Sequence, residues 1–254
     1  MKHLDNKHIW IIGASSGIGA ALAKELASRG AKLALSARRK ENLQDLMNHL
    51  DGEGHVIAPL DVANPESIKS AQADILKHFQ SIDSAIFLAA IYSPHDGQAK
   101  PLSFIHDMLN VNVGGAFNLI DSIQPHFEQH KQGQLVLCAS VAGYRGLPTG
   151  QPYCATKAAL INLGESLKIE LAPKNIDVKI ISPGFVRTPL TDKNDFQMPM
   201  MIEAEVAASA IADGLLKRHF EIHFPKRFTF IMKIIRMLPY GLFFMLSRFM
   251  AKKA

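Results

Sequence analysis

Three residues whose side chains can carry out acid-base chemistry stand at a regular spacing in the middle of the chain: Ser140, Tyr153 and Lys157. Tyr153 and Lys157 lie four residues apart in a segment of good helix formers, so the phenol and the ammonium should share one helical face. A free tyrosine keeps its proton up to a pH of about 10, and a nearby cation stabilises the phenolate. The pair is therefore suited to move a proton to or from a substrate oxygen.

Ser140 follows the apolar run 134–139, which predicts a buried strand. Its hydroxyl should emerge at the carboxyl end of that strand, where open α/β sheets bind ligands. Taken singly, these residues are more often a helix tyrosine, a solvated lysine and a serine that ends a strand. Their coincidence with a glycine-rich turn near the start of the chain favours hydride-transfer chemistry.

That turn has the spacing Gly-x3-Gly-x-Gly and lies between a predicted strand at 8–12 and a predicted amphipathic helix at 18–29. Gly13 permits the tight turn, Gly17 lets the backbone approach a pyrophosphate, and Gly19 permits close packing of helix on strand. The helix N-terminus would then face the phosphates. The context predicts a dinucleotide site, although such clusters are more often plain turns when they occur alone.

Together these motifs resemble the short-chain dehydrogenase/reductase (SDR) family, in its Tyr-x-x-x-Lys branch, over about residues 7–224. The resemblance implies that Tyr153 is the acid or base, that Ser140 holds the substrate oxygen, and that Lys157 binds the nicotinamide ribose and lowers the tyrosine pKa. Asn112 matches a fourth catalytic position, which supports a proton relay. Its alternative interpretation is an amide inside a helix.

The resemblance also implies a set of cofactor-binding positions, which includes an aspartate that contacts adenine and a loop that holds the nicotinamide amide. These positions are Gly13, Ser15, Ser16, Gly17, Ile18, Gly19, Arg38, Arg39, Asp61, Val62, Ala89, Tyr153, Lys157, Pro183, Gly184, Val186 and Thr188. Two departures from the family pattern occur: Ile12 replaces a threonine, and 87–90 reads Phe-Leu-Ala-Ala in place of Asn-Asn-Ala-Gly. The second departure puts hydrogen bonds between neighbouring strands in doubt.

Charge at the end of the second predicted strand bears on the choice of cofactor. NAD-dependent relatives keep an acidic residue there for the ribose hydroxyls, whereas this chain has Arg38 and Arg39. Guanidinium groups suit a 2′-phosphate, so we expect NADP(H), with Arg38 the stronger candidate. The alternative is a solvated basic start to the next helix.

The rest of the chain predicts one doubly wound α/β domain, a Rossmann fold with a parallel sheet of about seven strands. The strands are expected near 8–12, 32–37, 55–60, 84–88, 134–139, 177–181 and 220–224, alternating with helices. We expect a catalytic domain at 1–224 and a helical extension at 225–254. The 254 residues, 48% of them hydrophobic, are consistent with a single core.

The extension is basic and apolar. It holds 7 Lys and Arg and no acid, while the rest of the chain has 21 basic against 23 acidic residues, so the net charge of +5 arises in the extension. Pro239 should divide it into two short helices, which are too often interrupted by charge to cross a bilayer. Three roles remain open: an interfacial element on anionic lipid, a lid over an apolar cleft, or a subunit interface.

The segment 188–203 is apolar and rich in methionine, which favours a lipophilic aldehyde, ketone or 3-oxoacyl substrate. The alternative function is a non-catalytic NADPH-binding sensor or scaffold, possibly at a membrane surface. We expect a homo-oligomer, no bound metal and no nucleic-acid partner. The two cysteines, Cys138 and Cys154, and the absence of an apolar signal segment suggest the cytoplasm.

Overall fold

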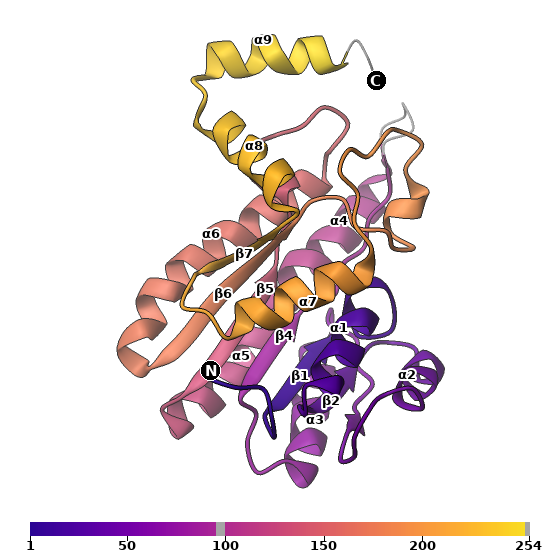
Figure 1. Cartoon of the computed structure of the whole chain (residues 1–254), viewed down its shortest axis with the longest axis vertical. Helices are drawn as coiled ribbons and strands as arrows, with labels where there is room; N and C mark the ends of the chain where they lie inside the picture. Colours follow the sequence, from indigo (N-terminus) through magenta and orange to yellow (C-terminus); the bar gives the residue numbers. More distant parts are fainter. Residues whose placement is uncertain (95–99, 252–254) are drawn as a thin grey trace.

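The computed structural model describes residues 1–94 and 100–251 and contains a seven-stranded parallel sheet in the order β3-β2-β1-β4-β5-β6-β7 (Figure 1). The strands are β1 (His8–Ile12), β2 (Lys32–Ser36), β3 (Val56–Ile57), β4 (Ser84–Phe87), β5 (Gly133–Cys138), β6 (Ile176–Pro183) and β7 (Glu221–Phe224). This arrangement confirms the predicted α/β Rossmann-like fold.

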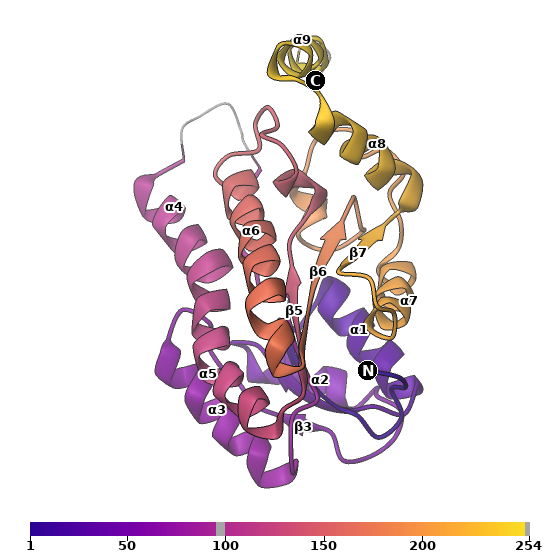
Figure 2. The ribbon, with the colours of Figure 1, turned by 90° about the vertical axis from the view of Figure 1, so that its left-hand side faces the viewer.

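Helices cover both faces of the sheet (Figures 1 and 2). One face packs against α1 (Gly17–Ser28), α2 (Lys40–Met47) and α7 (Ala204–Leu215). The other packs against α3 (Pro65–His78), α5 (Gly115–His130) and α6 (Tyr153–Leu171). Because successive strand side chains point to opposite faces, Ile9 and Ile11 enter the first core, and Trp10 and Ile12 enter the second. Both faces are buried, which explains why the strands are apolar throughout.

The third strand is shorter than the predicted 55–60. Only Val56–Ile57 forms a strand, but backbone pairing with β2 continues beyond it: Ala58 N–H donates to the Leu35 carbonyl at 3.0 Å, and Leu60 N–H to Ala37 at 3.2 Å. The chain therefore stays beside β2 up to the edge where ligands bind in such sheets.

A π-helical turn at Asn110–Gly114 joins α4 (Leu102–Leu109) to α5. Such turns are rare and often occur at functional sites. Here the turn holds Asn112, which is fully buried.

The extension forms two helices, α8 (Lys226–Met237) and α9 (Tyr240–Ala251), with Pro239 between them as predicted. The strands β6 and β7 point toward these helices, and α9 lies beyond the rest of the fold (Figure 2). Thr229 and Met232 of α8 are buried, so the first helix packs onto the body. No helix within residues 1–94 and 100–251 is long and apolar enough to cross a membrane.

Candidate active site

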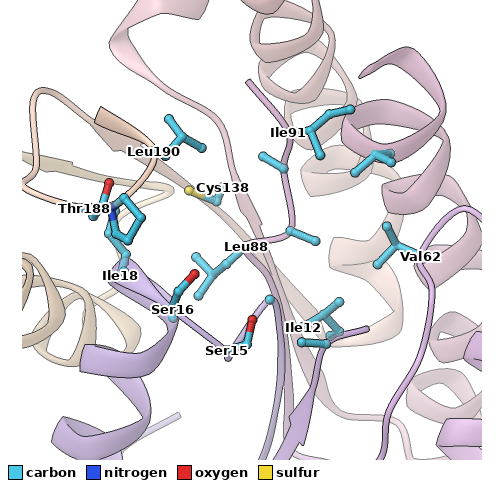
Figure 3. Close-up of a pocket in the computed structure, with 18 of the residues that line it drawn as sticks. Ile12, Ser15, Ser16, Ile18, Val62, Leu88, Ile91, Cys138, Thr188 and Leu190 are labelled. Atoms are coloured by element: carbon cyan, nitrogen blue, oxygen red, sulfur yellow. The ribbon is translucent and has the colours of Figure 1, made fainter. Parts of the chain in front are cut away.

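A cleft of about 630 Å³ opens at the carboxyl ends of the strands, and its lining residues lie between Ile12 and Thr191. Figure 3 shows side chains from separate elements, among them Ser16, Leu88 and Thr188, around this single cavity. The structure brings every position predicted to bind the cofactor to its wall. These positions are Gly13, Ser15, Ser16, Gly17, Ile18, Gly19, Arg38, Arg39, Asp61, Val62, Ala89, Tyr153, Lys157, Pro183, Gly184, Val186 and Thr188.

The glycine turn leaves room for a ligand because its residues lack side chains. A Cβ on Gly19 would lie 2.1 Å from the Gly13 carbonyl oxygen, so no larger residue fits without moving the turn. Gly17 has a φ of +54°, and its absent side chain would meet Thr188 across the cleft at 3.1 Å. The first turn of α1, which begins at Gly17, therefore presents free N–H groups to the cleft, as a dinucleotide phosphate requires.

Ser140 ends β5 and begins a short 3₁₀ turn at Val141–Gly143. Its hydroxyl oxygen accepts a hydrogen bond from the Ala142 N–H at 3.1 Å, and the hydroxyl donates to the Pro183 carbonyl at 3.4 Å. These contacts hold the side chain between the carboxyl ends of β5 and β6. The serine therefore lies at the edge of the sheet that the sequence indicated.

Tyr153 and Lys157 lie in the first turns of α6, and the Lys157 Nζ is 5.5 Å from the centre of the Tyr153 ring. The ammonium donates a hydrogen bond to the Cys138 carbonyl at 2.8 Å. The helix thus places a phenol and a cation side by side on the wall of the cleft, next to Ser140.

The electrostatics of the pair differ from the prediction in one respect. We expected Lys157 to lower the pKa of Tyr153, but burial dominates and raises that pKa, while a hydrogen bond with Ser140 acts in the opposite direction. Burial also lowers the pKa of Lys157. Both shifts have the same cause, because burial disfavours whichever form carries a charge. The Tyr153 phenol lies on the cleft wall, where it can act as a proton donor.

Asn112 does not line the cleft. Its side chain accepts a hydrogen bond from the Ile91 N–H at 2.8 Å, and its amide donates to the Ile91 carbonyl at 3.0 Å and to the Thr156 hydroxyl at 3.2 Å. The residue therefore clamps the chain that follows β4 to α6, three positions from Tyr153 along the helix. Asn112 therefore lies outside the cleft lining, where its amide can position the chain that forms the wall.

The departure from the family pattern at 87–90 leaves β1 and β4 connected. Leu88 N–H donates to the Ile12 carbonyl at 2.8 Å, which extends the parallel pairing of the two strands. In the family pattern, asparagine side chains at 87–90 would link these strands. Here a backbone hydrogen bond links β1 to β4, and Asn112 holds Ile91, which follows β4.

At the end of β2, Arg38 and Arg39 are exposed and border the cleft. Asp61 lies nearby, and its carboxylate accepts a hydrogen bond from the Ala63 N–H at 3.0 Å. This bond shapes the turn that carries Val62 into the cleft wall. The cleft therefore carries two guanidinium groups where β2 ends.

Several cleft residues were not found by sequence reasoning. They are Ile12, Ala37, Leu60, Leu88, Ala90, Ile91, Val111, Cys138, Ala139, Pro189, Leu190 and Thr191. Most adjoin residues that were predicted, so extending each motif by one or two positions would have included them. Leu190 and Thr191 belong to a loop folded by its own threonines, with the Thr191 hydroxyl donating to the Val186 carbonyl at 2.6 Å, and no local pattern signals that bend.

Both cysteines are free and buried. Within the described ranges, no group of three or more His, Cys, Asp or Glu side chains is arranged to hold a metal ion. His126 and His130 are neighbours on α5, and the His126 Nε2 accepts a hydrogen bond from the Ile82 N–H at 3.0 Å.

A parallel sheet with a glycine turn at one end of β1, and with a Ser, Tyr and Lys set around a shared cleft, defines a nucleotide-binding oxidoreductase. The short chain dehydrogenase family profile matches residues 7–198. The chain belongs to the short-chain dehydrogenase/reductase family.

Known relatives resemble the chain over most of its length. An uncharacterized oxidoreductase of Myxococcus xanthus is 29% identical over 249 residues, which cover 96% of this chain and 97% of the relative. A short chain dehydrogenase/reductase from Burkholderia phymatum, solved in complex with NAD, has a TM-score of 0.83 at 22% identity and covers 92% of this chain and 94% of its own. A short chain dehydrogenase from Burkholderia cenocepacia, solved with NADP, has a TM-score of 0.76 at 24% identity and covers 87% and 89%.

Proposed function

We propose that this SDR oxidoreductase uses NADP(H) and interconverts a lipophilic carbonyl compound with its alcohol. The observation that carries the proposal is the meeting of Ser140, Tyr153 and Lys157 at the wall of a cleft that is also lined by Arg38 and Arg39. The first three residues support the reaction, and the two arginines support the cofactor.

The cofactor preference rests on charge. Relatives with this fold have been solved with NAD and with NADP, so the fold does not decide between the two. Arg38 and Arg39 favour a 2′-phosphate because a guanidinium forms charge-assisted hydrogen bonds with phosphate oxygens. A bound nicotinamide exchanges hydride with the substrate carbon.

The residues of the chain supply the proton and hold the substrate oxygen. In the reductive direction, the Tyr153 hydroxyl donates its proton to the carbonyl oxygen as that oxygen gains charge. The Ser140 hydroxyl, turned from the Pro183 carbonyl toward the substrate, donates its one hydrogen bond to the same oxygen and so stabilises the developing charge. Lys157 uses one of its three N–H donors on the Cys138 carbonyl, which leaves two for the ribose hydroxyls.

The substrate class rests on the apolar side of the cleft. Leu88, Ile91 and Leu190 border the cavity (Figure 3). Outside the lining, next in the chain to the cleft residue Gly184, Phe185 lies 6.0 Å from Phe196 and 5.4 Å from Phe228, measured between ring centres. These side chains offer an apolar body of substrate more than they offer a charged one. They favour a lipophilic aldehyde, ketone or 3-oxoacyl compound.

The test is consumption of NADPH and of NADH with a chain-length series of aldehydes, ketones and 3-oxoacyl thioesters. The proposal predicts turnover that prefers NADPH and rises with the apolar length of the substrate. Turnover with NADH alone would refute the cofactor assignment. Tight NADPH binding with no turnover across the series would instead indicate a sensor or scaffold.

A further inference from the structure

Exposed apolar side chains gather on the two C-terminal helices. Of the fifteen large hydrophobic residues that are exposed in the described part of the chain, eight lie on α8 and α9. We call this set the tail face; it comprises Phe230, Ile231, Ile234, Met237, Tyr240, Leu242, Phe244 and Met245. On α8 the exposed positions recur at helical spacing and form one continuous stripe. Such a concentration of apolar surface indicates an interaction site.

The inner side of α8 fixes the direction of the tail face. The Lys233 ammonium forms a 2.6 Å ion pair with the Glu221 carboxylate, and Thr229 is buried with its hydroxyl 2.6 Å from the His223 ring nitrogen. Phe228 packs against the loop at Gly184. The helix is therefore docked on the body by polar and apolar contacts, and its stripe faces away from the body.

Arg145 contacts the junction between α8 and α9. Its guanidinium donates hydrogen bonds to the Arg236 carbonyl at 3.1 Å and to the Leu238 carbonyl at 2.5 Å. The same group lies over the rings of Tyr240 and Phe243, 4.9 and 5.0 Å from their centres. One residue of the body thus sets the angle at which α9 leaves α8, beyond the end of the sheet (Figures 1 and 2).

The tail face is not positioned to close the cleft. The residues that line the cleft lie between Ile12 and Thr191, so none of them belongs to α8 or α9, and Phe228 contacts Gly184, which is one of those residues. Phe228 belongs to the inner side of α8, opposite the stripe. The tail face is therefore open to a partner outside this chain.

The charge around the tail face favours an anionic partner. The segment 225–254 has seven basic residues and no acid. Lys233 and Arg236 form ion pairs with the body, at Glu221 and Glu165, whereas Arg227 and Arg248 are exposed at the two ends of the face. In a symmetric dimer, the tail face of one copy would pack against the tail face of the other. Basic residues would then meet basic residues, with no acidic residue of the segment to pair with them. A lipid surface accepts the apolar stripe and the cations at once.

We propose that α8 and α9 lie on the surface of an anionic bilayer, with the tail face in the headgroup region, and hold the oxidoreductase body at the membrane. The proposal does not depend on the cofactor or the substrate of the cleft. Two short helices at an angle, with no span, are suited to reversible binding in the plane of the interface.

The experiment is flotation of the full chain with vesicles of phosphatidylcholine alone and with vesicles that also contain phosphatidylglycerol. We expect binding to the anionic vesicles that weakens as salt rises. Phe230→Ser should lower the partition coefficient about tenfold, which corresponds to about 1.4 kcal/mol. Arg227→Gln should lower it about fivefold, or about 1 kcal/mol. Val206→Ser on α7 is the matched control, because Val206 is also exposed but lies on another face, and it should bind like the unaltered chain.

Two further measurements keep the result interpretable. An unchanged thermal unfolding transition, followed by circular dichroism, shows that each variant is folded, and light scattering reports the oligomeric state. Failure of the unaltered chain to float with anionic vesicles would overturn the proposal, as would equal binding by Phe230→Ser and Val206→Ser. An oligomer that dissociates in Phe230→Ser while vesicle binding is absent would assign the tail face to a second copy of the chain.

Discussion

Replacing Asn112 by alanine should destabilise the whole domain. The side chain is fully buried, and three hydrogen bonds join it to the Ile91 backbone and to Thr156. Alanine leaves the Ile91 N–H and carbonyl without their partner at the edge of the cleft. The effect should therefore appear first in stability and only secondarily in proton transfer.

The magnitude follows from the groups left unpaired. Each buried polar group that loses its partner costs about 1–3 kcal/mol, so two backbone groups cost roughly 2–5 kcal/mol if they relax partly. For a domain of this size, 1 kcal/mol lowers the melting temperature by about 2–4 °C, so the expected fall is roughly 4–20 °C. Thermal unfolding followed by circular dichroism measures it directly.

Asn118→Ala provides the matched control. Asn118 lies on the next helical turns and makes one hydrogen bond, from its amide to the Val62 carbonyl at 2.9 Å. Its loss should cost about 1 kcal/mol. If Asn112→Ala and Asn118→Ala melted at the same temperature, or if Asn112→Ala lost turnover with unchanged stability, the positioning role would be refuted and a direct relay role favoured.

Three other changes test separate parts of the account. Gly19→Ala should weaken NADPH binding at least about tenfold, because the new Cβ would meet the Gly13 carbonyl, whereas Gly146→Ala, with open space around it, should bind normally in a fluorescence titration. Arg38→Ala should weaken NADPH about tenfold and leave NADH unchanged in the same titration, and an equal loss for both cofactors would contradict the 2′-phosphate assignment. Burial lowers the pKa of His126 below 6.5, so the unfolded chain binds a proton there more readily; the free energy of unfolding should fall as the pH drops below that value, by at most about 1.4 kcal/mol per pH unit. Urea titrations at pH values above and below the His126 pKa should show that the free energy of unfolding depends less on pH in His126→Gln than in the unaltered chain.

Much of the fold was predictable because its signals are local. The β1 run is apolar throughout since both faces of a parallel strand are buried, and Tyr153 and Lys157 share a face because four residues make about one helical turn. The role of Gly19 was predictable for a similar reason, because the close approach of α1 to the turn after β1 leaves no room for a side chain at this position.

The rest depends on contacts between distant parts of the chain. The burial that raises the pKa of Tyr153 comes from packing, which the Tyr-x-x-x-Lys spacing does not encode. The Asn112 clamp on Ile91 spans 21 positions, and the Arg145 contact with Leu238 spans 93. The brevity of β3 likewise reflects its place at the sheet edge, where pairing with β2 alone defines it.

The central claim is that the Tyr153 hydroxyl transfers the proton in this cleft. The most direct test compares turnover and NADPH affinity of Tyr153→Phe with those of Tyr240→Phe, which removes the same hydroxyl from an exposed position on α9. We predict that Tyr153→Phe binds NADPH within a few fold of the unaltered affinity, because Lys157 and the glycine turn remain, and loses at least about a hundredfold in kcat, within the range typical of a lost general acid. Tyr240→Phe should be unchanged in both. Turnover of Tyr153→Phe within a few fold of the unaltered protein would contradict the account.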